Sequence, residues 1–221
     1  MYFKNRAEAG NLLAEGVKLG LPNLNTCVIA LSEGASLIGE EIASVIHSSL
    51  FFLAVEEIKL PGELNAFTGM SQGGVMTYNQ GRYSTSDIKE LAGEYDGFLQ
   101  GARIQKFRDL NINSVDTEIM SSMLDRHIVI LVSDGIDDPF TLQMAVDFLK
   151  PRSIHSLLVA TPLASVRAVD AIHLMADRII CLSVVENYVN TNHYYDENEM
   201  PTREQLVEKI KTISLKWRIA K

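Results

Sequence analysis

Short strand-like runs of apolar residues alternate with helical segments along most of this chain, and this alternation limits the fold more than any other feature. The runs lie at Thr26–Leu31, Leu50–Val55, His127–Val132, Ile154–Ala160 and Arg178–Leu182. Strands that are apolar along their whole length are typical of parallel sheets with both faces buried. We therefore predict an α/β fold, with a doubly wound, mainly parallel sheet of about five strands between two helical layers.

Chain length and one irregular stretch set the expected domain organisation. A chain of 221 residues is long enough for one α/β domain and short for two. Residues 83–124 are charged and mostly helical in pattern, with breaks at Gly93, Gly97 and Gly101. We expect a single domain over residues 1–221 in which residues 83–124 form a small helical insertion or hood. A last helix is expected over Arg203–Trp217.

Composition and charge indicate which kinds of partner and which cellular compartment to expect. The formal net charge of -8 disfavours nucleic acid as a partner. The apolar runs are too short to span a bilayer, and the first ten residues lack the apolar run of a secretory signal. We therefore expect a soluble cytoplasmic protein with no membrane partner. Cys27 and Cys181 lie in apolar strand-like runs, which predicts buried free thiols and no disulfide framework.

Three loops follow predicted strands, after Leu31, after Val55 and after Val132. Ligands of doubly wound sheets bind at the carboxyl ends of the strands. We therefore expect these three loops to converge on a single crevice.

The last of these loops carries a family resemblance. Residues 127–141 read HIVILVSDGIDDPFT, which resembles the phosphoribosyl pyrophosphate motif of four apolar residues, two acids, Gly and a Thr-Gly-rich loop that opens a helix. The most similar subfamily has the loop Asp-Asp-Gly-Ile-Ala-Thr-Gly-Ala-Thr. Further segments match that subfamily in order, namely Arg6–Gly10, Leu31–Ala35, Val55–Ile58, Pro61-Gly62, Gly69, Val159–Pro162 and Tyr194-Tyr195. The chain thus resembles the type I phosphoribosyltransferases over nearly its whole length, and the resemblance implies their fold and a site for a small phosphorylated ligand.

The resemblance also implies which residues would surround that ligand. Carried over position by position, the ribose-phosphate loop consists of Ser133, Asp134, Gly135, Asp137, Asp138 and Thr141. The other two crevice loops contribute Ser32, Glu33, Gly34, Glu56 and Glu57. No residue is identified as catalytic.

The ribose-phosphate loop departs from the family pattern. Ser133 stands where the family has the first ribose-holding acid, and only the second acid, Asp134, remains. Pro139 removes a backbone N–H from the phosphate cradle. A structural alternative explains the same change, because Asp138-Pro139 is a favoured pair for starting a helix. In that case the carboxylate of Asp138 occupies the place of the phosphate.

The other two loops also differ from the family pattern, because charges are reversed in them. Glu33 replaces the family's loop arginine, and Glu56-Glu57 replaces its Arg-Lys pair. Each reversed pair of unit charges is worth about 3 kcal/mol at a separation of about 5 Å and an effective dielectric constant of about 20. Together with Asp137-Asp138, these residues present negative charge to a polyanion from three loops.

Two functions stay open at this point. The first is a catalytically silent phosphoribosyltransferase-like protein that acts as a binding or regulatory module, with a protein partner or a second copy of itself. The second is an active transferase or related sugar-phosphate enzyme, in which Ser133, Asp134 and Thr141 hold the substrate with Mg²⁺.

Asp134, Glu56 and Glu57 are the candidate Mg²⁺ ligands, since carboxylate oxygens suit that ion. The alternative is that these carboxylates face solvent or pair with nearby basic residues such as Lys59.

Overall fold

A five-stranded parallel sheet forms the centre of the molecule. The computed structural model describes residues 1–21, 25–112, 120, 122–202, 205, 206, 208 and 210. The strands lie in the order β2-β1-β6-β7-β8, and each pairs in parallel with its neighbours. Their bounds are Thr26–Ala30 for β1, Ser49–Phe52 for β2, Ile128–Val132 for β6, Ser156–Ser165 for β7 and Arg178–Val185 for β8. The predicted fold class is confirmed.

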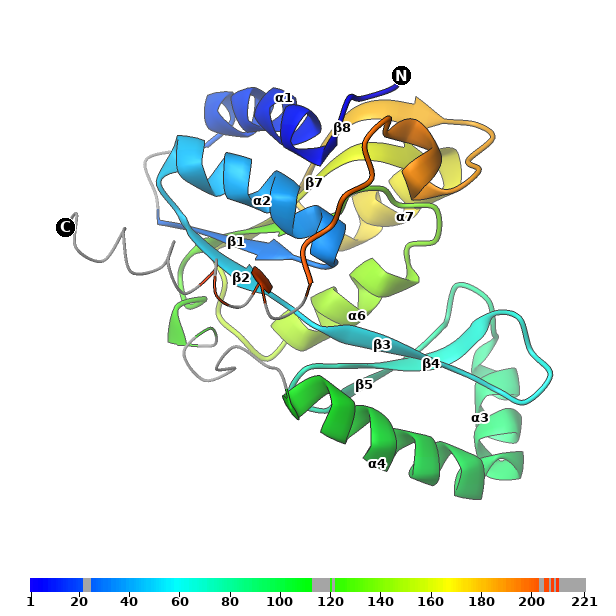
Figure 1. The fold of residues 1–221 in the computed structure, drawn as a ribbon. Helices are drawn as coiled ribbons and strands as arrows, with labels where there is room; N and C mark the ends of the chain where they lie inside the picture. The colour runs from blue at the N-terminus through cyan, green and yellow to red at the C-terminus, as the bar shows by residue number, and fades with distance from the viewer. Residues whose placement is uncertain are drawn as a thin grey trace.

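Helices cover both faces of this sheet (Figure 1). On one face lie α1 (Arg6–Leu19) and α2 (Glu33–Ile46), and on the other lie α6 (Phe140–Leu149) and α7 (Val166–Met175). Alternate residues of the strands supply the two cores. Val28 and Ile130 pack in the core of α1 and α2, whereas Ile29 and Leu131 pack in the core of α6 and α7. The uniformly apolar strands are therefore explained by burial on both sides.

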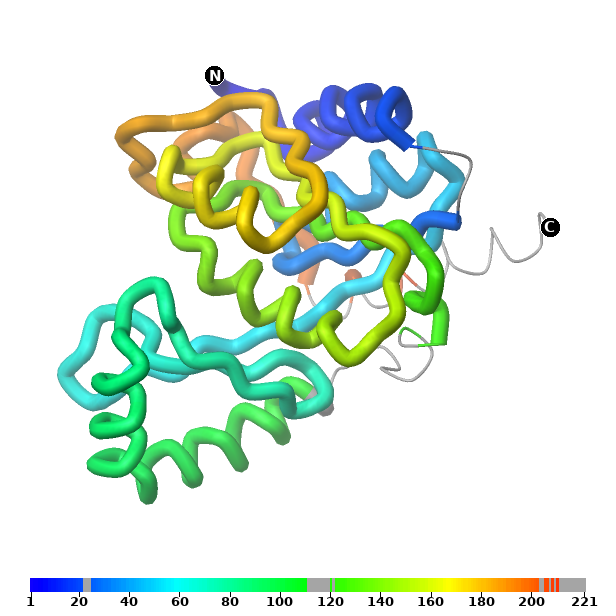
Figure 2. The backbone as a smooth tube through the Cα atoms, turned by 180° about the vertical axis from the view of Figure 1, so that it is seen from behind, coloured from blue at the N-terminus to red at the C-terminus, as the bar shows by residue number. Residues whose placement is uncertain are grey.

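A second, antiparallel sheet projects from the end of the central one. It consists of β3 (Val55–Lys59), β4 (Ala66–Ser71) and β5 (Val75–Tyr78), in that order. With α3 (Thr85–Glu94) and α4 (Asp96–Ile112) it forms a projecting lobe (Figure 2). The sheet of this lobe packs against α6, where Phe140 and Met144 cluster with Ala66 of β4.

This second sheet corrects two sequence predictions. The strand predicted at Leu50–Val55 is two strands, β2 and β3, which belong to different sheets and are separated by Leu53 and Ala54. The stretch around Gly62, Gly73 and Gly74, where the Pro61-Gly62 and Gly73-Gly74 pairs predict a loop-rich segment, contains a pair of hairpins. All three glycines have positive φ angles, between 82° and 87°, which is the backbone conformation that such turns require.

The expected helical insertion contains α3 and α4, while residues 113–119 and 121 lie outside the described residues. Most of the helix expected over Arg203–Trp217 also lies outside them. Within the described part of the chain, no helix combines the length and the apolar character that crossing a membrane would require.

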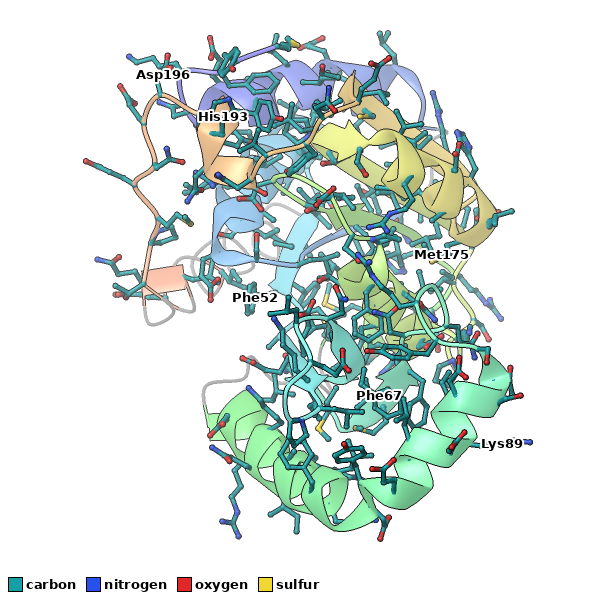
Figure 3. The ribbon with its side chains drawn as sticks, turned by 90° about the vertical axis from the view of Figure 1, so that its right-hand side faces the viewer. Phe52, Phe67, Lys89, Met175, His193 and Asp196 are labelled. Carbon is teal, nitrogen blue, oxygen red and sulfur yellow. The ribbon has the colours of Figure 1, made fainter. Side chains whose placement is uncertain are left out.

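The N-terminal segment and the segment that follows β8 meet beside α1. After β8 the chain forms a short 3-10 helix, η1 (Thr191–Tyr194), and Tyr195 then pairs with Phe3 in an isolated parallel bridge. Figure 3 shows the segment that carries His193 and Asp196 next to the N-terminal helix. We call residues 186–198 the tail segment. It runs back over the loop that follows β6, which is the loop that carries the family resemblance.

Candidate functional site

The carboxyl ends of β1 and β6 enclose a small cavity of about 150 Å³. Of the predicted site residues, those that line it are Ser32, Ser133, Asp134, Gly135, Asp138 and Thr141, and Leu31, Ile136 and Leu142 supply its apolar wall. The strand ends therefore bring together two of the three predicted loops, as expected for a doubly wound sheet.

The carboxylate of Asp134 is engaged by groups of its own chain. Arg6 Nε donates a hydrogen bond of 2.8 Å to Asp134 Oδ2, and the hydroxyl of Ser32 donates one of 2.7 Å to Oδ1. The side chain of Arg6 is 1% exposed and that of Asp134 is 12% exposed. This is a buried, charge-assisted pair of the kind that is strong when both partners are present.

The tail segment completes the coordination of Arg6. The two terminal nitrogens of Arg6 donate hydrogen bonds of 3.1 Å and 2.6 Å to the side-chain oxygens of Asn198 and Asn192, respectively. The guanidinium carbon lies 4.4 Å from the centre of the Tyr195 ring, a cation–π geometry. The Tyr195 hydroxyl donates a 2.7 Å hydrogen bond to the backbone carbonyl of Asp134. Arg6 thus ties the N-terminal helix and the tail segment to the loop after β6, and we call this arrangement the Arg6 clamp.

Two glycines make room for the clamp. A Cβ atom on Gly34 would lie 2.2 Å from Asp134 Oδ2 and 2.4 Å from Arg6 Nε. A Cβ atom on Gly135 would lie 2.2 Å from the hydroxyl oxygen of Tyr188. That hydroxyl shares a 2.9 Å hydrogen bond with Thr191, and burial raises the pKa of Tyr188 to about 12. Tyr188 is therefore a neutral group that covers the ribose-phosphate loop.

Asp138 fills the N-terminus of α6. Its Oδ1 atom accepts a 3.0 Å hydrogen bond from the backbone N–H of Phe140. Its Oδ2 atom accepts hydrogen bonds from Arg82, at 2.8 Å and 3.2 Å, and from Arg167, at 3.4 Å. The helix begins at Phe140, and Pro139 makes no side-chain cap bond. The predicted capping role of Asp138 is therefore confirmed only in part: its carboxylate accepts from the first N–H of the helix, but the N-cap position is occupied by Pro139.

We expect Asp138→Ala to lower the free energy of unfolding by about 1 kcal/mol, the usual value of such a cap. Asp138→Asn is the matched control, because it keeps an oxygen acceptor for the N–H of Phe140 and loses only the partly exposed ion pairs. In urea denaturation, the free energy of unfolding of Asp138→Asn should therefore lie between those of the wild type and Asp138→Ala. Equal stabilities of Ala and wild type would contradict the capping role.

The remaining predicted acids do not line the cavity. Glu33 is the first residue of α2, and Asp137 is exposed. Glu56 and Glu57 lie on β3 in the second sheet. Burial raises the pKa of Glu57, an effect that Lys59 opposes and Asp138 reinforces.

The candidate Mg²⁺ site is not assembled. Glu56 pairs with Lys106 of α4 at 2.9 Å, and Asp134 pairs with Arg6. Among residues 1–21, 25–112, 120 and the described positions from 122 onward, no three His, Cys, Asp or Glu side chains gather as a metal site. A basic side chain, Arg6 or Lys106, already pairs with two of the three candidate ligands, so these residues do not fit Mg²⁺.

Sequence reasoning missed the partners of Asp134. Arg6 lies on the same helical face as Ala9, Leu13 and Val17, all of which are buried. A lone arginine on an otherwise apolar face indicates a buried charge that needs an acidic partner. That signal was present, but it does not identify which acid pairs with Arg6.

The parallel sheet, its flanking helices and the projecting lobe form an α/β fold that solved structures share. TT1426 from Thermus thermophilus has a similar structure, with a TM-score of 0.69 at 21% identity over 98% of this chain and 99% of that one. A hypoxanthine-guanine phosphoribosyltransferase from Bacillus anthracis also matches, with a TM-score of 0.49 at 14% identity over 84% of this chain and 83% of that one. A purine phosphoribosyltransferase from Pyrococcus horikoshii gives 0.46 at 12% identity, over 88% and 89% of the two chains. No protein-family model matches the sequence.

Proposed function

We propose that this chain is a phosphoribosyltransferase-like protein that no longer transfers phosphoribosyl groups and acts as a binding or regulatory module. One observation carries the proposal: both oxygens of Asp134, the last ribose-holding acid of the motif, are engaged by Arg6 and Ser32.

A ribose that took both oxygens of Asp134 would have to displace these partners. Displacement would leave the guanidinium of Arg6 buried without its counter-charge, and breaking a buried pair typically costs about 3–5 kcal/mol. The ligand would also have to move Tyr195 and Tyr188, which cover the same loop. The Arg6 clamp thus acts as an internal competitor for the ribose position.

The phosphate position is filled in the same way. The N–H of Phe140, which could face a phosphate at this helix N-terminus, already donates to Asp138. Pro139 has no N–H to offer. The cavity of about 150 Å³ is also smaller than the roughly 300–1,000 Å³ of usual ligand pockets. The negative charge of the loops, the occupied or missing backbone N–H donors and the small cavity volume all disfavour binding of phosphoribosyl pyrophosphate.

A second candidate function is an enzyme acting on a smaller sugar phosphate. The hydroxyl-bearing side chains of Ser32, Ser133 and Thr141 support it, because all three line the cavity. Hydroxyl groups can hydrogen-bond a sugar or a phosphate without adding charge.

Thermal unfolding with phosphoribosyl pyrophosphate and Mg²⁺, and in parallel with ribose 5-phosphate as the smaller sugar phosphate, separates the two candidates. A ligand at about a hundred times its dissociation constant stabilises the native state by about 2.7 kcal/mol. For a chain of this size that raises Tm by roughly 5–10 °C. We expect no resolvable shift for the wild-type chain. A shift of that size that needs the ligand and disappears in Thr141→Val would overturn the proposal in favour of the enzyme.

The triple variant Glu33→Arg, Asp138→Thr, Pro139→Gly is the matched control. It restores a positive charge, a hydroxyl and a backbone donor to the two loops beside Asp134. A shift gained in this variant would show that substitution removed the ligand site from an otherwise suitable fold.

A further inference from the structure

A groove of about 460 Å³ lies between β3 of the second sheet and α4 of the same lobe (Figure 1). This volume is within the roughly 300–1,000 Å³ of usual ligand pockets. From β3 the groove is lined by Glu57, Ile58 and Lys59, and from α4 its lining includes Gly97, Gly101 and Gln105. None of these residues lines the cavity beside Asp134, so the groove is a second, separate site.

The strand on one side of this groove has an open edge. β3 pairs with β4, and within the residues that the structure describes no strand pairs with its other side. The carbonyl of Ala54, just before β3, accepts a 2.8 Å hydrogen bond from the N–H of Gln72, which follows β4. Backbone groups alternate along an antiparallel strand, so those of Glu56 also face β4 and those of Glu57 face the open edge. The groove therefore offers an N–H and a C=O to an added strand.

The helix on the other side leaves room for such a strand. Gly97 and Gly101 lie one turn apart on α4, both are exposed, and a Cβ atom on either would meet no other atom within 4 Å. Glycine is unfavourable inside helices, and it is the residue that permits close approach of another backbone. Gln105, one turn further along, adds a side-chain amide that can donate to and accept from a peptide bond.

Lys59 gives one end of the groove a positive charge. It is exposed and forms no ion pair with any described residue, although its charge opposes the rise in the pKa of Glu57. Lys106, the other lysine of the groove, already pairs with Glu56 at 2.9 Å. A β-bulge between Ile58 and Lys59 ends the regular edge of β3, so an added strand would leave the edge beside Lys59. A carboxylate on the occupant is favoured at that end.

We propose that the groove binds an extended peptide of a partner protein, which adds to the open edge of β3 and places an acidic residue beside Lys59. In this mode main-chain hydrogen bonds supply the affinity, and the walls of the groove select side chains. A small amphipathic molecule would leave the edge of β3 unpaired, so the open edge favours a peptide. The proposal does not depend on the ribose-phosphate site, and it holds or fails whether or not that site is silent.

Fluorescence anisotropy of the full chain with a labelled peptide tests the site. The probe is fluorescein-Gly-Gly-Asp-Val-Thr-Val-Asp-amide, which brings an acid to Lys59 in either strand direction. Gly101→Leu should weaken binding by about tenfold or more, because the leucine side chain fills the place of the strand. Gly93→Leu is the matched control, since a Cβ atom there also meets nothing within 4 Å and Gly93 lies outside the groove, on α3. Circular dichroism checks that both variants are folded.

Two changes to the peptide test its charge and its backbone. With both acids replaced by asparagine it should bind the wild-type chain about fivefold more weakly, as for an exposed ion pair, and Lys59→Met should abolish this difference. Methylation of the two valine nitrogens, or of the threonine and last aspartate nitrogens, blocks alternate N–H groups. One methylated peptide should lose binding and the other keep it, because only one set of N–H groups faces β3.

Three results would each overturn the proposal. The first is no binding of the probe by the wild-type chain at concentrations up to about 1 mM. The second is equal binding by Gly101→Leu and Gly93→Leu. The third is equal binding of the two methylated peptides, which would indicate an occupant held by side-chain contacts and not by the edge of β3.

Discussion

Replacing Arg6 by Met is expected to lower the free energy of unfolding by about 3–5 kcal/mol, the usual cost of breaking a buried ion pair. The loss arises because Asp134 would stay buried without its counter-charge, and because Asn192 and Asn198 would lose a shared donor. For a small domain this is a large part of the total stability. Chemical denaturation followed by circular dichroism measures it.

The double variant Arg6→Met, Asp134→Asn sharpens this test. Removing both charges leaves no unpaired ion, so the double variant should be more stable than Arg6→Met alone. Arg167→Met is the matched control, because its ion pair with Asp138 is 3.4 Å long with side chains 57% and 37% exposed. Exposed pairs contribute about 0–1 kcal/mol. A loss for Arg6→Met as small as the control's would show that the clamp does not hold the fold together.

Gly34→Ala is expected to lower the free energy of unfolding by about 3 kcal/mol. The added methyl group would lie 2.2 Å from Asp134 Oδ2 and 2.4 Å from Arg6 Nε. These atoms cannot move aside without lengthening the buried pair, so the cost combines overpacking of about 1–3 kcal/mol with a partial loss of the ion pair. The measurement is again the denaturation midpoint.

Gly93→Ala is the matched control, because a Cβ atom there meets nothing within 4 Å and the residue lies within α3. Alanine is favoured over glycine in helices by up to about 1 kcal/mol, so the control should be neutral or stabilising. If Gly34→Ala behaved like Gly93→Ala, the tight contact at Asp134 would be refuted.

The central sheet could be predicted from the sequence because its strands are buried on both faces. Apolar runs at Thr26–Leu31 and His127–Val132 became β1 and β6 with ends displaced by one residue. The second sheet was not predictable by the same signal. Its middle strand, β4, is buried throughout yet contains Thr68, Gly69 and Ser71, so its composition resembles that of a loop. The hydroxyl of Thr68 can be buried there because it donates a hydrogen bond to the backbone carbonyl of Thr77.

The site was predictable in part. Asp134, Ser32 and the α6 start were found because they are consecutive with strands whose ends must meet. The Arg6 clamp was not found, because the sequence separation between Arg6 and Asp134 is 128 residues and no spacing rule links such positions. The position of Glu56 also escaped prediction, since its partner Lys106 lies on a helix whose packing depends on the unrecognised second sheet.

The Arg6 clamp also orders events during synthesis. Arg6 leaves the ribosome before Asn192 and Asn198, which follow it by 186 and 192 positions. Contacts of such long range form late, because the intervening chain must first be made and brought into place. The first helix must therefore dock with a guanidinium that still lacks its partners. Closure of the loop after β6 therefore waits until the tail segment has been synthesised.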